Sequence, residues 1–107
     1  MMKLQQLLQS RREDILAVAL RHGAFNVRVF GSVARGEETQ SSDIDFLVDY
    51  DLQKILPWFP VRLIRDLEDL LNRKVDVVTE KGLKARIRDR VLAEAKSLVD
   101  FTLKEAV

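Results

Sequence analysis

The amino-acid sequence predicts a small α/β domain in which a three-stranded mixed sheet is flanked by helices. Three short apolar runs at residues 27–30, 43–48 and 74–79 have strand character, and the segments around them show helical periodicity. The predicted order is helix, strand, short helix, strand, helix, strand, helix, which is typical of helices packed on one sheet. A chain of 107 residues is long enough for one core, so residues 1–107 are expected to form a single domain.

Three long helices are expected at residues 3–22, 61–72 and 83 to about 99. Each has an apolar stripe near the helical period, and Gly23 and Gly82 break the chain at a helix end and a helix start. His22, the only histidine, lies in the last turn of the first helix. It is interpreted as a surface residue that compensates the helix dipole rather than as a catalyst.

Composition excludes several classes of protein. With 47% hydrophobic and 33% charged residues the sequence is that of a globular protein rather than a disordered one. The net charge of +1 gives no strong field for nucleic acid, and the absence of cysteine excludes disulfides and thiolate metal sites. No apolar run approaches the ~20 residues of a membrane span and no signal peptide is visible, so a cytoplasmic location without membrane contact is expected.

Two surface features have open interpretations. Trp58, the only tryptophan, lies between two prolines and could pack over the core edge, which we favour, or present a partner surface or a nucleobase platform. Arg86, Arg88 and Arg90 make the first half of the last helix basic. A solvated face is favoured over a nucleic-acid site, because no aromatic platform accompanies the charges, and docking to an acidic partner protein stays open.

The central chemical feature is a pair of aspartates, Asp43 and Asp45, in a segment that alternates acidic and bulky apolar residues. A period of two is typical of a strand, so Ile44, Phe46 and Val48 would face a core while the two acids share the other face. Their Cα atoms would lie roughly 6.6 Å apart. Two such carboxylates can converge on one Mg²⁺ ion, which proteins hold through one or two carboxylates and substrate phosphates.

Gly31 and Ser32 form a second candidate site between a predicted strand and a short helix. A glycine there lets the backbone approach a ligand closely, and the helix start offers N–H groups to an anion. Ser32 adds a hydroxyl group. A phosphate pocket beside an acid pair suits phosphoryl or nucleotidyl transfer, in which catalysis is mostly positioning and charge neutralisation.

Each motif alone has a simpler interpretation. A Gly-Ser turn is usually only a turn, and Asp-x-Asp is usually a solvated strand face. Asp76, inside the valine-rich third strand, would need a cation or a hydrogen-bond donor if buried, and an arginine or lysine could serve. The combination of the motifs, with a strand on each side, is far more specific.

The run from Gly31-Ser32 through ten residues to Asp43-Ile44-Asp45 resembles the signature of the DNA polymerase beta-type nucleotidyltransferase superfamily. The short chain and the form GSVARGEETQSSDIDFLVDY are similar to the minimal nucleotidyltransferase antitoxins, which pair with HEPN-domain toxins. In that family a third acid lies on a later strand, and Asp76 matches it. Val33 departs from the pattern, since many relatives carry a basic residue there.

The resemblance implies a small polymerase beta-like nucleotidyltransferase domain that transfers the AMP moiety of ATP to a hydroxyl, by family a tyrosine, of a HEPN toxin. Asp43, Asp45 and Asp76 would be the catalytic and Mg²⁺-binding acids, with Asp76 also helping to deprotonate the acceptor. Gly31 and Ser32 would grip the triphosphate, and Arg35 would neutralise its charge. A hetero-oligomer with the toxin is expected, without direct nucleic-acid binding.

Three alternatives remain at this point. A non-enzymatic antitoxin would act by binding alone, but three intact acids argue against a relic motif. A small-molecule nucleotidyltransferase would need an acceptor pocket, which a second domain usually supplies. Templated or RNA-tailing polymerase activity is least favoured, because no domain is left to hold a nucleic acid.

Overall fold

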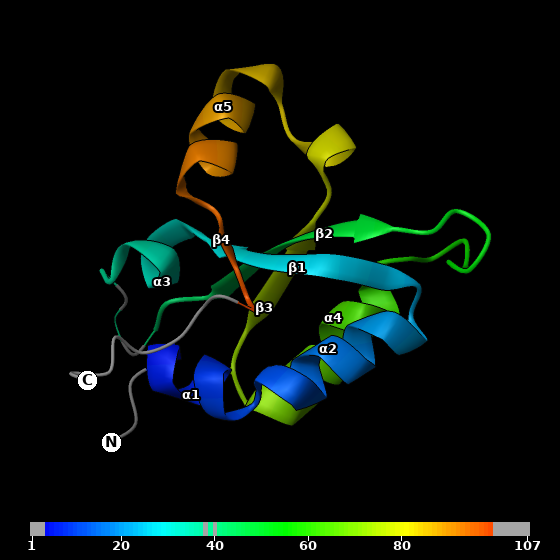
Figure 1. The fold of residues 1–107 in the computed structure, drawn as a ribbon, viewed down its shortest axis with the longest axis horizontal. Coiled ribbons are helices and arrows are strands. Elements are labelled where there is room, and N and C mark those ends of the chain that lie inside the picture. Colours follow the sequence, from blue (N-terminus) through cyan, green and yellow to red (C-terminus); the bar gives the residue numbers. More distant parts are fainter. Residues whose placement is uncertain (1–3, 38, 40, 100–107) are drawn as a thin grey trace.

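The computed structural model describes residues 4–37, 39 and 41–99, which form one mixed sheet with helices on both faces (Figure 1). The four strands lie in the order β3-β2-β1-β4. Their bounds are Ala24–Phe30 for β1, Ile44–Tyr50 for β2, Val75–Val78 for β3 and Lys96–Ser97 for β4. β2 is antiparallel to β1 and parallel to β3, and β4 is antiparallel to β1. The predicted α/β class and mixed sheet are confirmed, and the short strand β4 is an addition.

The predicted first helix is divided into two, α1 (Leu4–Ser10) and α2 (Arg12–Arg21). The break falls at Arg11, with φ −105° and ψ 11°. Just before it, the Ser10 hydroxyl donates to the Leu7 carbonyl at 2.9 Å, and this kind of side-chain bond competes with the helical backbone ladder. Leu8 and Ile15, one from each helix, are fully buried in the same core cluster, so the break does not separate the two halves from the core.

Two further helices match their predictions to different degrees. α4 (Val61–Leu71) ends at Asn72, whose φ of 54° is the left-handed conformation common after helices. α5 (Ala85–Glu94) is shorter than the predicted helix to about residue 99. Beyond it the chain extends into β4, where the buried Leu98 donates its N–H to Val27 at 2.8 Å. None of the helices in the described ranges has the length and apolar character needed to cross a membrane.

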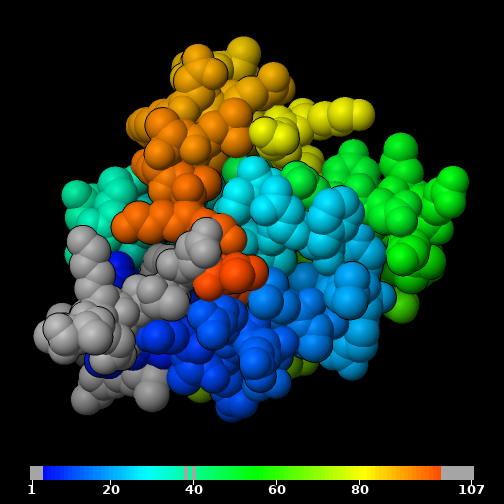
Figure 2. Space-filling model, in the orientation of Figure 1, coloured from blue at the N-terminus to red at the C-terminus, as the bar shows by residue number. Residues whose placement is uncertain are grey.

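The sheet separates two apolar clusters of unequal size. α1, α2 and α4 cover one face, and α5 stands on the other, where it forms a raised part of the surface (Figures 1 and 2). Ile44, Phe46 and Val48 of β2 are at most 1% exposed and belong to the larger cluster, as the alternation predicts. Leu47 points the other way and packs with Leu83 and Val91 under α5. The side chain of Asp45 therefore lies on the α5 face of the sheet.

Candidate functional site

Gly31 begins the short helix α3 (Gly31–Arg35) directly after β1 and packs against the carboxylate of Asp45. The two elements meet because Phe30, the last residue of β1, is paired with Asp45 of β2. A Cβ atom built on Gly31 would lie 2.3 Å from Asp45 Oδ2, and the φ of Gly31 is +77°. Both the left-handed backbone and the close approach require glycine. The predicted glycine turn and one predicted acid thus form a single site.

Asp45 and Asp76 are direct neighbours on parallel strands. The β2–β3 register pairs them, so their Cα atoms are about 4.8 Å apart and their side chains share one face. Asp76 is exposed between the buried residues Val75 and Val77, and among the described residues it forms no ion pair. The alternative of a structural salt bridge at Asp76 is therefore not supported. Asp43, also exposed, immediately precedes β2.

The acid cluster has an unbalanced negative charge. Burial of the Asp45 carboxyl group is the largest cause that raises the pKa of Asp45, to about 6. Repulsion adds to this shift, from Asp76, Asp43 and Glu94 in that order, while Arg35 acts in the opposite direction. Within the described part of the chain, Asp45 has no hydrogen bond or ion pair to stabilise its charge. A bound cation would relieve this repulsion.

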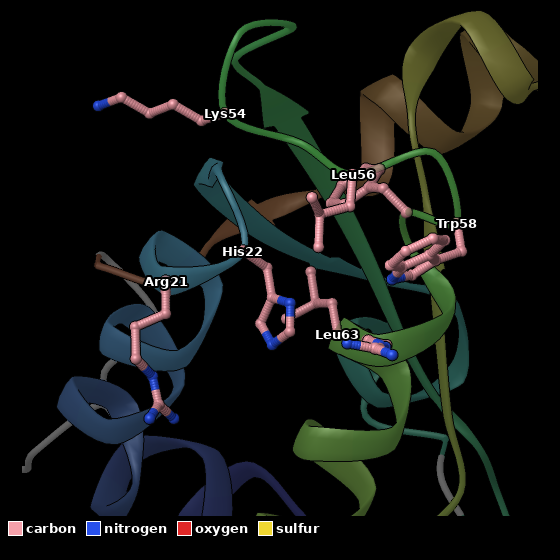
Figure 3. A pocket seen from close by; sticks show the side chains of 8 residues that line it. Arg21, His22, Lys54, Leu56, Trp58 and Leu63 are labelled. Atoms are coloured by element: carbon pink, nitrogen blue, oxygen red, sulfur yellow. The ribbon is translucent and has the colours of Figure 1, made fainter.

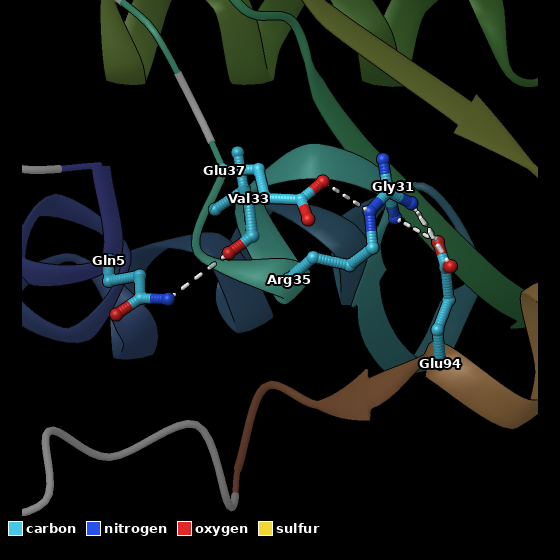
Figure 4. A network of polar contacts seen from close by, with 6 residues as sticks. All are labelled: Gln5, Gly31, Val33, Arg35, Glu37 and Glu94. Atoms are coloured by element: carbon cyan, nitrogen blue, oxygen red, sulfur yellow. Dashed lines mark hydrogen bonds and ion pairs between the residues drawn. The ribbon is translucent and has the colours of Figure 1, made fainter.

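Glu94, at the end of α5, extends the site in a way that the sequence did not reveal. Its Oε2 accepts a hydrogen bond from the backbone N–H of Gly31 at 2.6 Å (Figure 4). Arg35 Nη1 donates to both carboxylate oxygens of Glu94, at 3.0 and 3.1 Å, and Arg35 Nε donates to Glu37 at 2.9 Å. The Glu94 carboxylate thus accepts hydrogen bonds from the Gly31 N–H group and the Arg35 guanidinium, the two groups that the sequence predicted as contacts of a phosphate.

α3 is fixed from its other side by α1. Gln5 Nε2 donates to the carbonyl of Val33 at 3.1 Å (Figure 4). Val33 and Ala34 are the buried residues of α3. Ser32 is half-buried, and its carbonyl accepts the N–H of Glu37 at 2.9 Å. Its hydroxyl bonds to no other residue in the described ranges, so it remains able to contact a ligand. The structure therefore brings Gly31, Ser32 and Arg35 beside the acids.

The three acids fit a Mg²⁺ ion that shares its ligands with a substrate, rather than a closed protein cage. In the described ranges, no three carboxylates are already placed to hold a metal by themselves. The half-buried Asp45 without a counter-ion, next to Asp43 and Asp76, nevertheless offers the hard oxygen ligands that Mg²⁺ prefers. Substrate phosphates usually complete such a coordination shell.

Comparison with known proteins identifies the family. A model for the nucleotidyltransferase domain matches residues 12–98. The chain belongs to the nucleotidyltransferase domain family. The chain is 39% identical to a Methanocaldococcus jannaschii protein that is named as a protein adenylyltransferase. The match covers 78% of this chain and 89% of that protein. The chain is also 35% identical to the protein adenylyltransferase MntA of Thermococcus cleftensis, over 86% of this chain and 89% of MntA.

Solved structures show the same fold. A structure described as a minimal nucleotidyltransferase is 47% identical, with a TM-score of 0.75 over 86% of this nucleotidyltransferase and 93% of that chain. A toxin–antitoxin crystal structure with AMP-PNP has a TM-score of 0.62 at 22% identity, over 84% and 71% of the two chains. The first supports the resemblance to minimal nucleotidyltransferases, and the second shows likeness of fold alone.

Apart from Glu94, the residues that the structure places at this candidate site are those that the sequence predicted. Glu94 lies in a helix whose charge pattern is typical of a solvated face, and no local motif marks it. It reaches the site only because α5 packs across the sheet onto Leu47 and ends above Gly31. Such a contact between residues 63 apart depends on tertiary packing, which spacing along the sequence does not report.

Proposed function

We propose that this nucleotidyltransferase transfers the AMP moiety of ATP to a side-chain hydroxyl, by family a tyrosine, of a HEPN-domain toxin and so neutralises it. The pairing of Asp45 with Asp76 beside Gly31 is the observation that carries the proposal. Two relatives with protein adenylyltransferase names support the reaction class. The kind of partner follows from the resemblance to the minimal nucleotidyltransferase antitoxins, and a toxin–antitoxin structure with AMP-PNP has the same fold.

In this proposal the chain's own residues position the triphosphate. Gly31, which has no side chain, lets the Asp45 carboxylate lie directly against the start of α3, where the triphosphate would bind. Ser32 would donate its hydroxyl to a phosphate oxygen, and Arg35 would neutralise charge once it leaves Glu94. Asp43, Asp45 and Asp76 would hold Mg²⁺, which supplies Lewis-acid stabilisation of the phosphoryl oxygens when bound.

The transfer exchanges one bond for another at the α-phosphorus of ATP. The acceptor oxygen forms a bond to this phosphorus, the bond to the bridging oxygen of the β-phosphate breaks, and pyrophosphate leaves. Asp76 accepts the hydroxyl proton. Its exposure suits an acceptor that arrives on the surface of a folded protein. AMP on the toxin would add bulk and negative charge where that toxin must bind RNA.

The test is the intact mass of the purified cognate toxin after incubation with this protein, ATP and Mg²⁺. We expect a mass increase of one or more AMP groups, and its loss in the variants Asp43→Asn and Asp76→Asn. Asp69→Asn is the matched control, because Asp69 is exposed on α4, which covers the opposite face of the sheet. A toxin that is inhibited while its mass stays unchanged would show neutralisation by binding alone.

A further inference from the structure

A hollow lies where β2 ends, at the opposite end of this strand from Asp45, and Figure 3 shows the side chains that line it. It has a volume of about 280 Å³ and is formed by the end of α2, the segment after β2 and the start of α4. Its lining residues are Arg21, His22, Lys54, Leu56, Trp58, Phe59, Arg62 and Leu63. β1 begins two residues after His22 and ends at Phe30, directly before Gly31, so the two sites are roughly 20 Å apart, from six residue steps of strand.

The hollow is positively charged. Arg21, Lys54 and Arg62 line it, no acid does, and none of the three forms an ion pair with a residue in the described ranges. Asp66 lies beside the hollow, where His22 Nε2, one of the lining groups, contacts its carboxylate at 2.7 Å. Figure 3 shows the charged ends of Arg21 and Lys54 at the outer edge of the hollow, so these two side chains and Arg62 give its surroundings a positive charge that attracts an anionic group. This local charge is not visible in the net charge of +1.

The same hollow exposes apolar surface. Trp58 is 47% exposed and Leu56 51%, so the favoured prediction that the indole packs over the core edge is only partly correct. The guanidinium of Arg62 lies 4.9 Å from the centre of the indole ring, which holds both side chains at the rim. Leu20 and Val61, which precede lining residues in the sequence, are exposed as well. Tryptophan and arginine together are typical of the residues that dominate protein interfaces.

The segment that carries Trp58 is held in place by the rest of the domain. Asp51 donates its N–H to Gly23 at 2.9 Å, and the Asp51 carbonyl accepts the N–H groups of Lys54 and Ile55 at 2.9 and 3.1 Å. Further along, the ring of Phe59 packs against Tyr50 with a centroid distance of 5.6 Å. A hollow that is already formed costs little conformational entropy when it binds a partner.

We propose that this hollow docks an acidic segment of the protein that receives AMP, with carboxylates on Arg21, Lys54 and Arg62 and an apolar side chain against Trp58. The identity of that partner as the AMP acceptor rests on the proposed function. An acidic peptide fits better than single-stranded nucleic acid, because one indole offers no stacking platform for successive bases. The exposed Leu56, which also lines the hollow, suits an apolar side chain rather than a base.

Trp58 provides the test, because it is the only tryptophan and its fluorescence reports directly on the hollow. The probes are three tryptophan-free peptides and one RNA: an Asp/Glu-rich peptide with a central Leu-Phe, the same peptide with Ser-Gly in place of Leu-Phe, a Lys-rich peptide with Leu-Phe, and oligouridylate. We expect saturable binding of the first peptide only, weakened by added salt. Equal binding of any other probe, or no binding of the first, would overturn the proposal.

Charge-reversal variants locate the binding. Lys54→Glu and Arg62→Glu should each weaken the acidic peptide roughly tenfold. Arg88→Glu, an exposed arginine on α5 outside the hollow, should leave it unchanged. Equal losses in all three variants would indicate unspecific attraction and refute the assignment.

The docking and transfer proposals can fail separately. With the cognate toxin, Lys54→Glu should slow AMP transfer at low toxin concentration while Mg-ATP binding stays at the wild-type level. If neither the wild-type protein nor any variant transfers AMP but the acidic peptide still binds in the hollow, the proposed function is wrong and the docking site stands. If transfer is normal in Lys54→Glu and Arg62→Glu, the docking proposal is wrong and the proposed function stands.

Discussion

Replacement of Gly31 by alanine is expected both to destabilise the protein and to displace the carboxylate of Asp45. The new Cβ atom would meet Asp45 Oδ2 at 2.3 Å, far inside the distance at which real contacts occur, so the carboxylate must move. The left-handed backbone adds a second cost, because the φ of Gly31 is +77°. Gly36 separates the two effects, since its φ is +74° but its nearest neighbour would be Gln5 Nε2 at an ordinary 3.8 Å.

The two costs can be estimated from their physical causes. A non-glycine residue in the left-handed region costs roughly 1–2 kcal/mol, which is the whole effect expected for Gly36→Ala. Forcing an extra methyl group into occupied space costs about 1–3 kcal/mol more, so Gly31→Ala should lose roughly 2–5 kcal/mol of unfolding free energy. A domain of this size has on the order of 5–15 kcal/mol of stability, so the variant should still fold.

The assay is urea unfolding of both glycine variants in the wild-type and Asp45→Ala backgrounds. Removal of the Asp45 carboxylate should reduce the cost of Gly31→Ala to that of Gly36→Ala and leave the cost of Gly36→Ala unchanged. The difference is the coupling free energy between residues 31 and 45, expected at roughly 1–3 kcal/mol. Equal costs of Gly31→Ala in the two backgrounds would refute the proposed packing of glycine against the acid.

Two further predictions concern the charges of the site. Because burial and then the neighbouring carboxylates raise the pKa of Asp45 to about 6, above its ordinary 3.8, the contribution of Asp45 to the stability of the ion-free protein should fall as pH rises from 4 to 7. Asp45→Asn should therefore be more stable than wild type in urea unfolding at pH 7, by roughly 1–2 kcal/mol after allowance for the solvent that screens this half-buried group, and close to it at pH 4; a less stable variant at pH 7 would contradict this. Glu94→Gln should tighten Mg-ATP binding several-fold in calorimetry, because the triphosphate no longer displaces a carboxylate from Gly31 and Arg35. Glu37→Gln, which alters only the bond to Arg35, should have a smaller effect, and weaker binding by Glu94→Gln would instead make Glu94 part of the nucleotide site.

The parts of the fold that the sequence predicted are those with a strong local signal. The alternation in β2 correctly indicated which side chains enter the core, and Ile44 and Phe46 are fully buried. The segment 61–72 has a continuous apolar stripe, and the helix α4 occupies it to within one residue. Gly31 and Asp45 could be placed together because both lie at the ends of strands that are neighbours in the sheet.

The missed features depend on contacts between distant parts of the chain. Helical periodicity continues through Arg11, so the break between α1 and α2 is not visible in the apolar pattern. The apolar residues after α5 fit a helix as well as a strand, and the strand is selected by pairing with β1, including the hydrogen bond from Leu98 to Val27. The contact of Glu94 with Gly31 and the hollow around Trp58 likewise arise from packing.

The pairing of Asp45 with Asp76 also affects how the chain can fold. In β3 the acid alternates with valines, so a shift of one residue against β2 would turn Asp76 into the larger core cluster and expose Val75 and Val77. Burial of an unpaired carboxylate is costly, so this misaligned sheet is strongly disfavoured. Asp76, which the native β2–β3 register places beside Asp45, is thus also the residue that disfavours the shifted register. A chain whose β2 and β3 are correctly aligned therefore has both carboxylates in place.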